Sequence, residues 1–234
     1  MRTHHGTHAF ANVQVFTDET TTAHWKRYAE IHIRMYPYLR RVVLDGVAQG
    51  GAPAWMPMPL AFPADDAMWS LKDEIMLGPS LLVAPVVTQG AVSRAVVFPS
   101  ARFVRFDLID VDVDVADGPA TIDVGADVGE IPVFIVAGGI VPMTAEPADT
   151  LMRDPDGDGP ITGLESTEGD RVVYVALGAP GSFVEESGAS YVLEGDGVAA
   201  GEEEVTGDDV IQGDGFTFTL TGHPNARTTR VIFR

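Results

Sequence analysis

The stretch IMLGPSLLVAPVVTQGAVSRAVVFPSARF, residues 75–103, alternates short apolar runs with glycine and proline. Its segment 81–87, LLVAPVV, is a continuous apolar run of the length of a buried strand. Glycine and proline interrupt the runs at turn-like intervals, and no helical period of three to four residues crosses them. This stretch therefore predicts that the chain is built from short strands from Ser80 onward.

The segments that follow continue this pattern. Residues 110–115, DVDVDV, alternate strictly, which predicts a strand with Val111, Val113 and Val115 on one face. Residues 131–142, IPVFIVAGGIVP, predict another buried strand or a pair of strands. A loop-like segment then leads to four short strand patterns at hairpin spacing, which predict an antiparallel sandwich: 171–178, 189–197, 216–222 and 228–234.

The N-terminal region differs, because residues 20–48 carry the one long helical period of the chain. Asp18 or a neighbouring threonine is suited to cap its start, and Pro37 predicts a kink or a break. The proline-rich segment 53–66 that comes next predicts an extended connector. A lone strand–helix unit cannot cover its own apolar face, so we expect residues 1–51 to belong to a larger structure.

Composition narrows the classes of partner. Fifteen basic and 34 acidic residues give a formal charge of 15 − 34 = −19. Such a surface repels phosphate backbones, so nucleic acid and anionic membranes are not expected partners. The absence of cysteine excludes disulfides and thiolate chemistry. No apolar run reaches the length of about 18 residues that a membrane span needs, and no charged-then-apolar leader pattern precedes the first motif, so neither a membrane span nor a signal peptide is expected in these residues.

Two segments carry side chains that could bind a metal ion or a substrate. His4, His5 and His8 lie within the first eight residues, which is compatible with a metal site, a tag or one wall of a catalytic pocket. Residues 154–165, DPDGDGPITGLE, match the spacing of a twelve-residue calcium loop, with Asp154, Asp156, Asp158 and Glu165 as ligands. An acidic linker would produce a similar string, and a strand rather than a helix is expected after it. Any calcium there would be structural, and no cofactor is expected to be required.

Several motifs resemble glycoside hydrolase family 31, the α-glucosidases and α-xylosidases, in collinear order over residues 1–143. MRTH at the start resembles the family's Arg-x-His, and YAEIHIRMYPYL, residues 28–39, resembles the helix that follows. Residues 50–66, 75–103 and 131–143 resemble the family's connector, its Leu-Leu-Val-Ala-Pro-Val segment and its closing strand. The chain departs from the pattern at Met58, where the family has arginine, and at Phe103, where it has tryptophan.

The resemblance implies a mainly β fold with an N-terminal helix. Residues 1–51 would be the last strand end and helix of a (β/α)₈ catalytic barrel, followed by a proximal β-sandwich, 52–144, and a distal β domain, 145–234. The family hydrolyses α-glycosides with retention, using an aspartate nucleophile and an aspartate acid/base that must lie about 5–5.5 Å apart. Both would lie upstream of Met1, in a barrel portion that this chain lacks.

The resemblance thus predicts a C-terminal fragment of a retaining α-glycosidase that is inactive alone. Its expected partners are the rest of the barrel and an α-linked oligosaccharide, with His4 contacting a sugar hydroxyl. Arg2 would support the barrel rim. The alternative is a non-catalytic β-sandwich module that binds carbohydrate or calcium. Acidity, lack of cysteine and the candidate calcium loop favour a periplasmic or extracellular location without deciding it.

Overall fold

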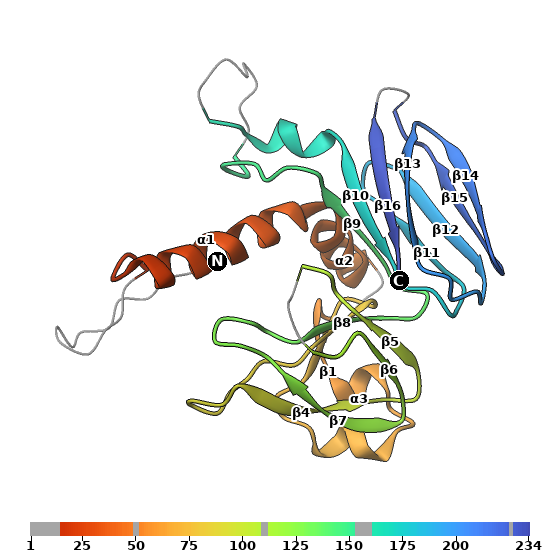
Figure 1. Ribbon diagram of the computed structural model, residues 1–234. Coiled ribbons are helices and arrows are strands. Elements are labelled where there is room, and N and C mark those ends of the chain that lie inside the picture. The colour runs from red at the N-terminus through yellow and green to blue at the C-terminus, as the bar shows by residue number, and fades with distance from the viewer. Residues whose placement is uncertain (1–14, 49–51, 109–111, 153–160, 225–226) are drawn as a thin grey trace.

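A computed structural model describes residues 15–48, 52–108, 112–152, 161–224 and 227–234 of the chain. It is mainly β with few helices, as the sequence predicts. Figure 1 shows two β regions, one below and one at the right, with a helix that extends away from the space between them. No helix within these residues is long and apolar enough to cross a membrane.

The N-terminal region forms two helices, α1 (Glu19–Arg34) and α2 (Tyr36–Ala48). Asp18 caps α1, because its Oδ1 accepts a hydrogen bond from the Thr21 backbone N–H at 2.7 Å. The predicted break at Pro37 is confirmed: Met35 ends α1 and Pro37 occupies the second position of α2. Proline is tolerated there because the first helical N–H groups have no intrahelical acceptor.

The proximal β region is a six-stranded antiparallel sheet in the order β1-β2-β3-β8-β5-β6, with a separate two-stranded ribbon β4-β7. The sheet strands are β1 (Trp55–Pro57), β2 (Ile75–Leu77), β3 (Leu81–Val83), β8 (Val133–Val136), β5 (Arg102–Arg105) and β6 (Val115–Asp117). The ribbon consists of β4 (Ser93–Phe98) and β7 (Ala120–Gly125). The apolar run 81–87 supplies β3, and Leu81 and Leu82 are buried as predicted.

The distal β region packs two four-stranded sheets, β13-β16-β10-β9 and β11-β12-β15-β14. Their strands are β9 (Ile140–Thr144), β10 (Arg171–Val175), β11 (Gly181–Val184), β12 (Ser190–Gly195), β13 (Gly201–Thr206), β14 (Asp209–Gly213), β15 (Phe216–Thr221) and β16 (Thr228–Phe233). A short 3₁₀ helix, η2 (Leu164–Glu168), precedes β10. The four predicted strand patterns are confirmed as β10, β12, β15 and β16. One pairing departs from a purely antiparallel sandwich, because β10 and β16 run parallel.

Gly138 and Gly139 divide the apolar segment 131–143 into two strands of different sheets. β8 pairs with β3 and β5 of the proximal sheet, whereas β9 pairs with β10 of the distal sandwich. Gly138 has φ 80°, a left-handed conformation that favours glycine, and a Cβ on Gly138 would lie 2.5 Å from the Pro180 carbonyl oxygen. The chain thus changes sheets at these two glycines, a few residues before the boundary expected after 144.

Two sequence predictions are wrong in detail. In the described part of the alternating segment 110–115, residues 112–114 are not a strand; β6 begins at Val115, and Ala116 is the buried residue. The proline-rich connector is not extended throughout, because it contains the single-turn helix α3 (Met58–Ala61) and is followed by the 3₁₀ helix η1 (Asp66–Ser70). Pro59 lies in the first turn of α3, where its missing N–H costs no hydrogen bond.

One apolar core runs through both β regions and α2. Tyr38, fully buried on α2, stacks on Phe183 of the distal sandwich with ring centroids 5.4 Å apart. Its hydroxyl donates to the Leu77 carbonyl oxygen of the proximal sheet at 2.8 Å and accepts from the Ser80 N–H at 3.1 Å. Burial raises the pKa of Tyr38 to about 12, so it stays neutral at physiological pH. Tyr38 therefore fastens α2 to both β regions.

Candidate functional site

Most of the predicted site residues lie outside the described part of the chain. His4, Asp154, Asp156 and Asp158 are among these, so their predicted roles stay predictions. Glu165, the last candidate calcium ligand, is described: it lies in η2 and is exposed. Within the described residues, no group of three or more histidine, aspartate or glutamate side chains could hold a metal ion.

Hydrogen bonds join Asp149, which precedes the candidate calcium loop, to Thr162, which lies within it. Thr162 donates its backbone N–H and its hydroxyl to Asp149 Oδ2, at 2.8 and 2.9 Å. The Asp149 N–H donates in return to the Thr162 hydroxyl oxygen at 3.0 Å. These hydrogen bonds hold the pKa of Asp149 below its ordinary value. The segment between the two residues is thereby tied at its ends.

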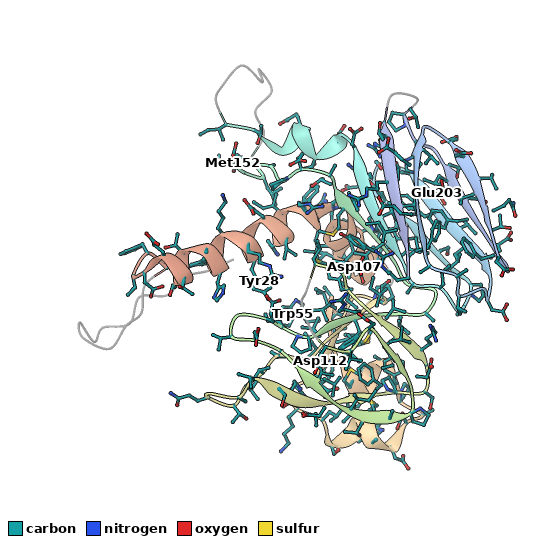
Figure 2. The ribbon with its side chains drawn as sticks, in the orientation of Figure 1. Tyr28, Trp55, Asp107, Asp112, Met152 and Glu203 are labelled. Carbon is teal, nitrogen blue, oxygen red and sulfur yellow. The ribbon has the colours of Figure 1, made fainter. Side chains whose placement is uncertain are left out.

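The helix that follows the His4 segment is held to the β regions by polar contacts. Arg27 forms an ion pair with Glu130 and donates to the Leu108 carbonyl oxygen at 2.7 Å. Tyr28, labelled in Figure 2, donates its hydroxyl to the Gly129 carbonyl oxygen at 2.6 Å. Nearer to the end of α1, Arg34 Nε donates to the Thr144 carbonyl oxygen at 3.0 Å. One side of α1 thus contacts loops of both β regions.

The other side of α1 carries apolar side chains that are partly buried but lie outside the core cluster. None of its sixteen residues, all of which are described, is buried. Tyr28 and Ile31 pack against the core, but Trp25, Ala29 and Ile33 are not among the described residues that do so. Spacing of four residues places these three along one stripe of the helix. We call Trp25, Ala29 and Ile33 the outer stripe.

The two buried glutamates of the described residues are each paired with an arginine. Glu74 accepts from Arg94 Nη2 at 2.7 Å and from the Val97 N–H at 3.1 Å, and burial raises the pKa of Glu74. Glu185 accepts from Arg171 and, at 2.5 Å, from the Tyr191 hydroxyl. Burial opposes ionisation of Glu185, but the hydrogen bonds and charge of Arg171 hold its pKa below the ordinary value.

These two carboxylates lie in different β regions and their acceptor sites are occupied by arginine. A retaining glycosidase needs two carboxyls about 5–5.5 Å apart with access to a sugar. The buried carboxylates of the described residues therefore do not form such a pair. Asp65 and Asp66 do not form one either, because Asp65 Oδ1 accepts from the Ala67 N–H as the cap of η1.

Three cavities lie where helices and strands of different regions meet. A cavity of about 400 Å³ lies between α2, β1 and β11, and one of about 320 Å³ lies between the start of α2 and the turn after β11. A third, of about 360 Å³, lies between β5, β6 and the end of β16 and is lined by Arg102, Arg105 and Arg234. We call the third cavity the arginine pocket. No sequence motif indicates it, because its arginines come from strands far apart in the chain.

The motif resemblance and the fold can be compared with known proteins. A sequence profile of the glycosyl hydrolase family 31 C-terminal domain matches residues 51–141. Isomaltosyltransferase from Sporosarcina globispora is 29% identical over 133 residues, which are 56% of this chain and 12% of that protein. Sulfoquinovosidase from Agrobacterium fabrum is 32% identical over 99 residues, 42% of this chain and 15% of that protein.

The chain thus carries a glycosyl hydrolase family 31 C-terminal domain at residues 51–141. The crystal structure of the family 31 α-xylosidase from Xanthomonas citri has the same fold over 96% of this chain and 23% of its own, with a TM-score of 0.64 at 21% identity. The resemblance drawn from the motifs is thus confirmed. The chain spans only 12% and 15% of the lengths of the two relatives above. These matches therefore do not assign to it the activity of a whole family 31 protein.

The family 31 match includes the two positions at which the chain departs from the motif pattern. Met58 and Phe103 are both fully buried, and the Phe103 ring lies 5.4 Å from that of Phe98. Apolar packing has thus taken the place of an arginine and a tryptophan inside the proximal β region. Neither position lines the arginine pocket.

Proposed function

We propose that this chain is the C-terminal part of a retaining α-glycosidase that hydrolyses O-glycosyl bonds of α-linked oligosaccharides. Residues 1–51 would be the end of its catalytic barrel, 52–144 the proximal β-sandwich and 145–234 the distal β domain. Family 31 relatives named as α-glucosidases support the class of reaction. The relative named isomaltosyltransferase is compatible with it, since a retained glycosyl-enzyme can pass to water or to a sugar hydroxyl.

The observation that carries the barrel assignment is the outer stripe of α1. An amphipathic helix is stabilised mainly by packing its apolar face, yet Trp25, Ala29 and Ile33 are only partly buried and lie outside the apolar core of the described residues. The helices of a (β/α)₈ barrel pack against the barrel strands and against neighbouring helices. A barrel portion would therefore supply the cover that the outer stripe lacks.

The chain would contribute one wall of the sugar site rather than its chemistry. α1 is held by Arg27, Tyr28 and Arg34, and it would anchor the segment that carries His4. A neutral imidazole has one donor and one acceptor, which suits a sugar hydroxyl beside ionised carboxylates. The nucleophile and the acid/base would come from the barrel portion. Without them the chain has no means to cleave a glycosidic bond.

Activity measurements test this proposal. We expect the purified 234-residue chain to release no nitrophenol from 4-nitrophenyl α-glucoside or α-xyloside. Turnover that copurifies with the chain would overturn the proposal. In an enzyme that carries both carboxylates as well as this chain, His4→Ala should lower kcat/KM about tenfold, the effect of one hydrogen bond of roughly 1.4 kcal/mol. His5→Ala is the matched control and should change kcat/KM less than twofold.

We also propose a structural calcium ion in the loop of Asp154, Asp156, Asp158 and Glu165. Oxygen ligands at this spacing suit calcium, and hydrogen bonds to Asp149 already hold Thr162, which lies within the loop. Calorimetric titration with calcium should give saturable heat with the wild-type chain and little with Asp156→Ala. If the wild-type chain gives no heat, the calcium proposal is wrong. The glycosidase proposal does not depend on this result.

A further inference from the structure

The arginine pocket brings three arginines together, and two aspartates, Asp107 and Asp114, also line it. Arg102 and Arg105 lie at the two ends of β5, and Arg234 follows β16 at the end of the distal sandwich. The pocket therefore lies between the two β regions, as does Asp107, which is labelled in Figure 2. Three of the fifteen basic residues of the chain line this one cavity.

Two of the three arginines have partners that are mostly in solvent. Arg102 Nη1 lies 3.3 Å from Asp117 Oδ1, and Arg105 Nε lies 3.1 Å from Asp114 Oδ1. The side chains of Asp117 and Asp114 are 71% and 80% exposed. Exposed ion pairs of this kind contribute little to stability, since water competes for both charges. These two carboxylates can therefore be displaced at little cost.

Arg102 also has donor capacity that the protein does not use. Its Nε is buried, and no hydrogen-bond acceptor for it lies among the described residues. Its side chain passes over Gly178 of the distal sandwich, where a Cβ would lie 2.9 Å from Arg102 Cδ. Gly178 has φ 102°, so glycine is favoured there for both its conformation and the space it leaves. The guanidinium is thus positioned at the junction of the two β regions.

Arg234 is held more firmly. Its Nε and Nη2 lie 2.8 and 2.6 Å from Asp107 Oδ2, and its Nη1 donates to the Phe233 carbonyl oxygen at 3.0 Å. This arrangement fixes the third guanidinium beside Asp107, which follows β5. Val115 and Val198 add an apolar part to the lining.

We propose that the arginine pocket binds a small organic anion that carries two or more carboxylate or phosphate groups. Guanidinium groups bind such oxygens bidentately, and arginines from two β regions can hold two groups of one molecule. The volume of about 360 Å³ exceeds what a single inorganic oxyanion fills, and the valines suit a short carbon skeleton. Binding would join β5 to the end of β16 and thereby stabilise the contact between the β regions.

Calorimetric titration of the 234-residue chain with citrate at low ionic strength tests the proposal, with glucose as the uncharged comparison. We expect saturable citrate binding with a Kd of about 1 mM or below and none for glucose. Arg102→Gln should weaken citrate binding at least tenfold. Arg230→Gln is the matched control: it makes the same charge change in the distal sandwich, where Arg230 pairs with Glu202, and should alter the Kd less than twofold.

Asp114→Asn should change the affinity for citrate in the opposite direction. It removes a carboxylate that competes for Arg105, so citrate should bind several-fold more tightly, an effect that loss of folding cannot produce. The absence of saturable citrate binding to the wild-type chain would overturn the proposal. Equal weakening in Arg102→Gln and Arg230→Gln would also overturn it, because the effect would then reflect net charge alone. Binding of glucose as strong as that of citrate would show that the cavity does not select charge.

Discussion

Glu185 and Glu186 are adjacent and chemically identical, yet the fold gives them opposite environments. Glu185 is 3% exposed and accepts hydrogen bonds from Arg171, itself 3% exposed, and from Tyr191. Glu186 is exposed and pairs with Arg40 at 2.7 Å on the surface. No local pattern distinguishes the two residues, because their partners come from strands and helices elsewhere in the chain.

Replacing each of these glutamates by glutamine should therefore lower the free energy of unfolding by very different amounts. Glu185→Gln should lower the free energy of unfolding by about 3–5 kcal/mol, since it leaves the Arg171 charge buried without a counter-charge. Urea denaturation followed by circular dichroism measures this.

Glu186→Gln is the matched control and should lower the free energy of unfolding far less, because its ion pair is exposed to water. Equal costs at positions 185 and 186 would show that the buried pair with Arg171 does not contribute as the structure indicates.

Local chemistry at single residues was predictable where it depends on near neighbours. Asp18 was expected to cap a helix and does so, because the acceptor for the first turn needs only the next few residues. His4 and the three aspartates of the calcium loop lie outside the described residues, so their roles stay predictions.

At the scale of elements, the helical period and Pro37 predicted α1 and α2 and the break between them. The pattern did not predict how the apolar residues of α1 divide between two faces. Ile31 packs against the core of the described residues, whereas Ile33 belongs to the outer stripe. The division depends on where the loop before β8 contacts the helix, through Arg27 and Tyr28.

This division can be tested with two substitutions of the same type. Ile31→Ala in the 234-residue chain should lower the free energy of unfolding by about 1–2 kcal/mol, because it removes packing against the core. Ile33→Ala should cost less in the same chain, because Ile33 does not pack against the core cluster. A larger loss for Ile33→Ala, measured by urea denaturation, would mean that the outer stripe is already covered.

The strands show where period-two reasoning succeeds and where it fails. The continuous run at 81–83 and the patterns of β10, β12, β15 and β16 were predicted because burial of apolar side chains decides them. The alternation at 110–115 was misleading, since residues 112–114 are not a strand and only Val115 of the described valines joins β6. β6 instead buries the small Ala116 against the proximal sheet. Alternation describes an amphipathic segment, but pairing requires a neighbouring strand.

At the scale of the whole molecule, the two β regions share one core rather than two. Phe106 of the proximal region meets Tyr174 of the distal sandwich edge to face, with ring centroids 5.0 Å apart. Tyr38 joins both regions through α2. The arginine pocket lies at the same junction, and this is why its three arginines are unrecognisable as a group in the sequence.

The sequence by itself determined the mainly β class, the two N-terminal helices and the family, because these depend on local periodicity and on motifs in collinear order. Only the tertiary structure decided that the chain changes sheets at Gly138–Gly139, that β10 pairs with β16 in parallel, and that Arg102, Arg105 and Arg234 share one pocket. These features depend on contacts between residues far apart in the chain. Their energies are set by which surfaces meet and exclude water, and no local pattern records that.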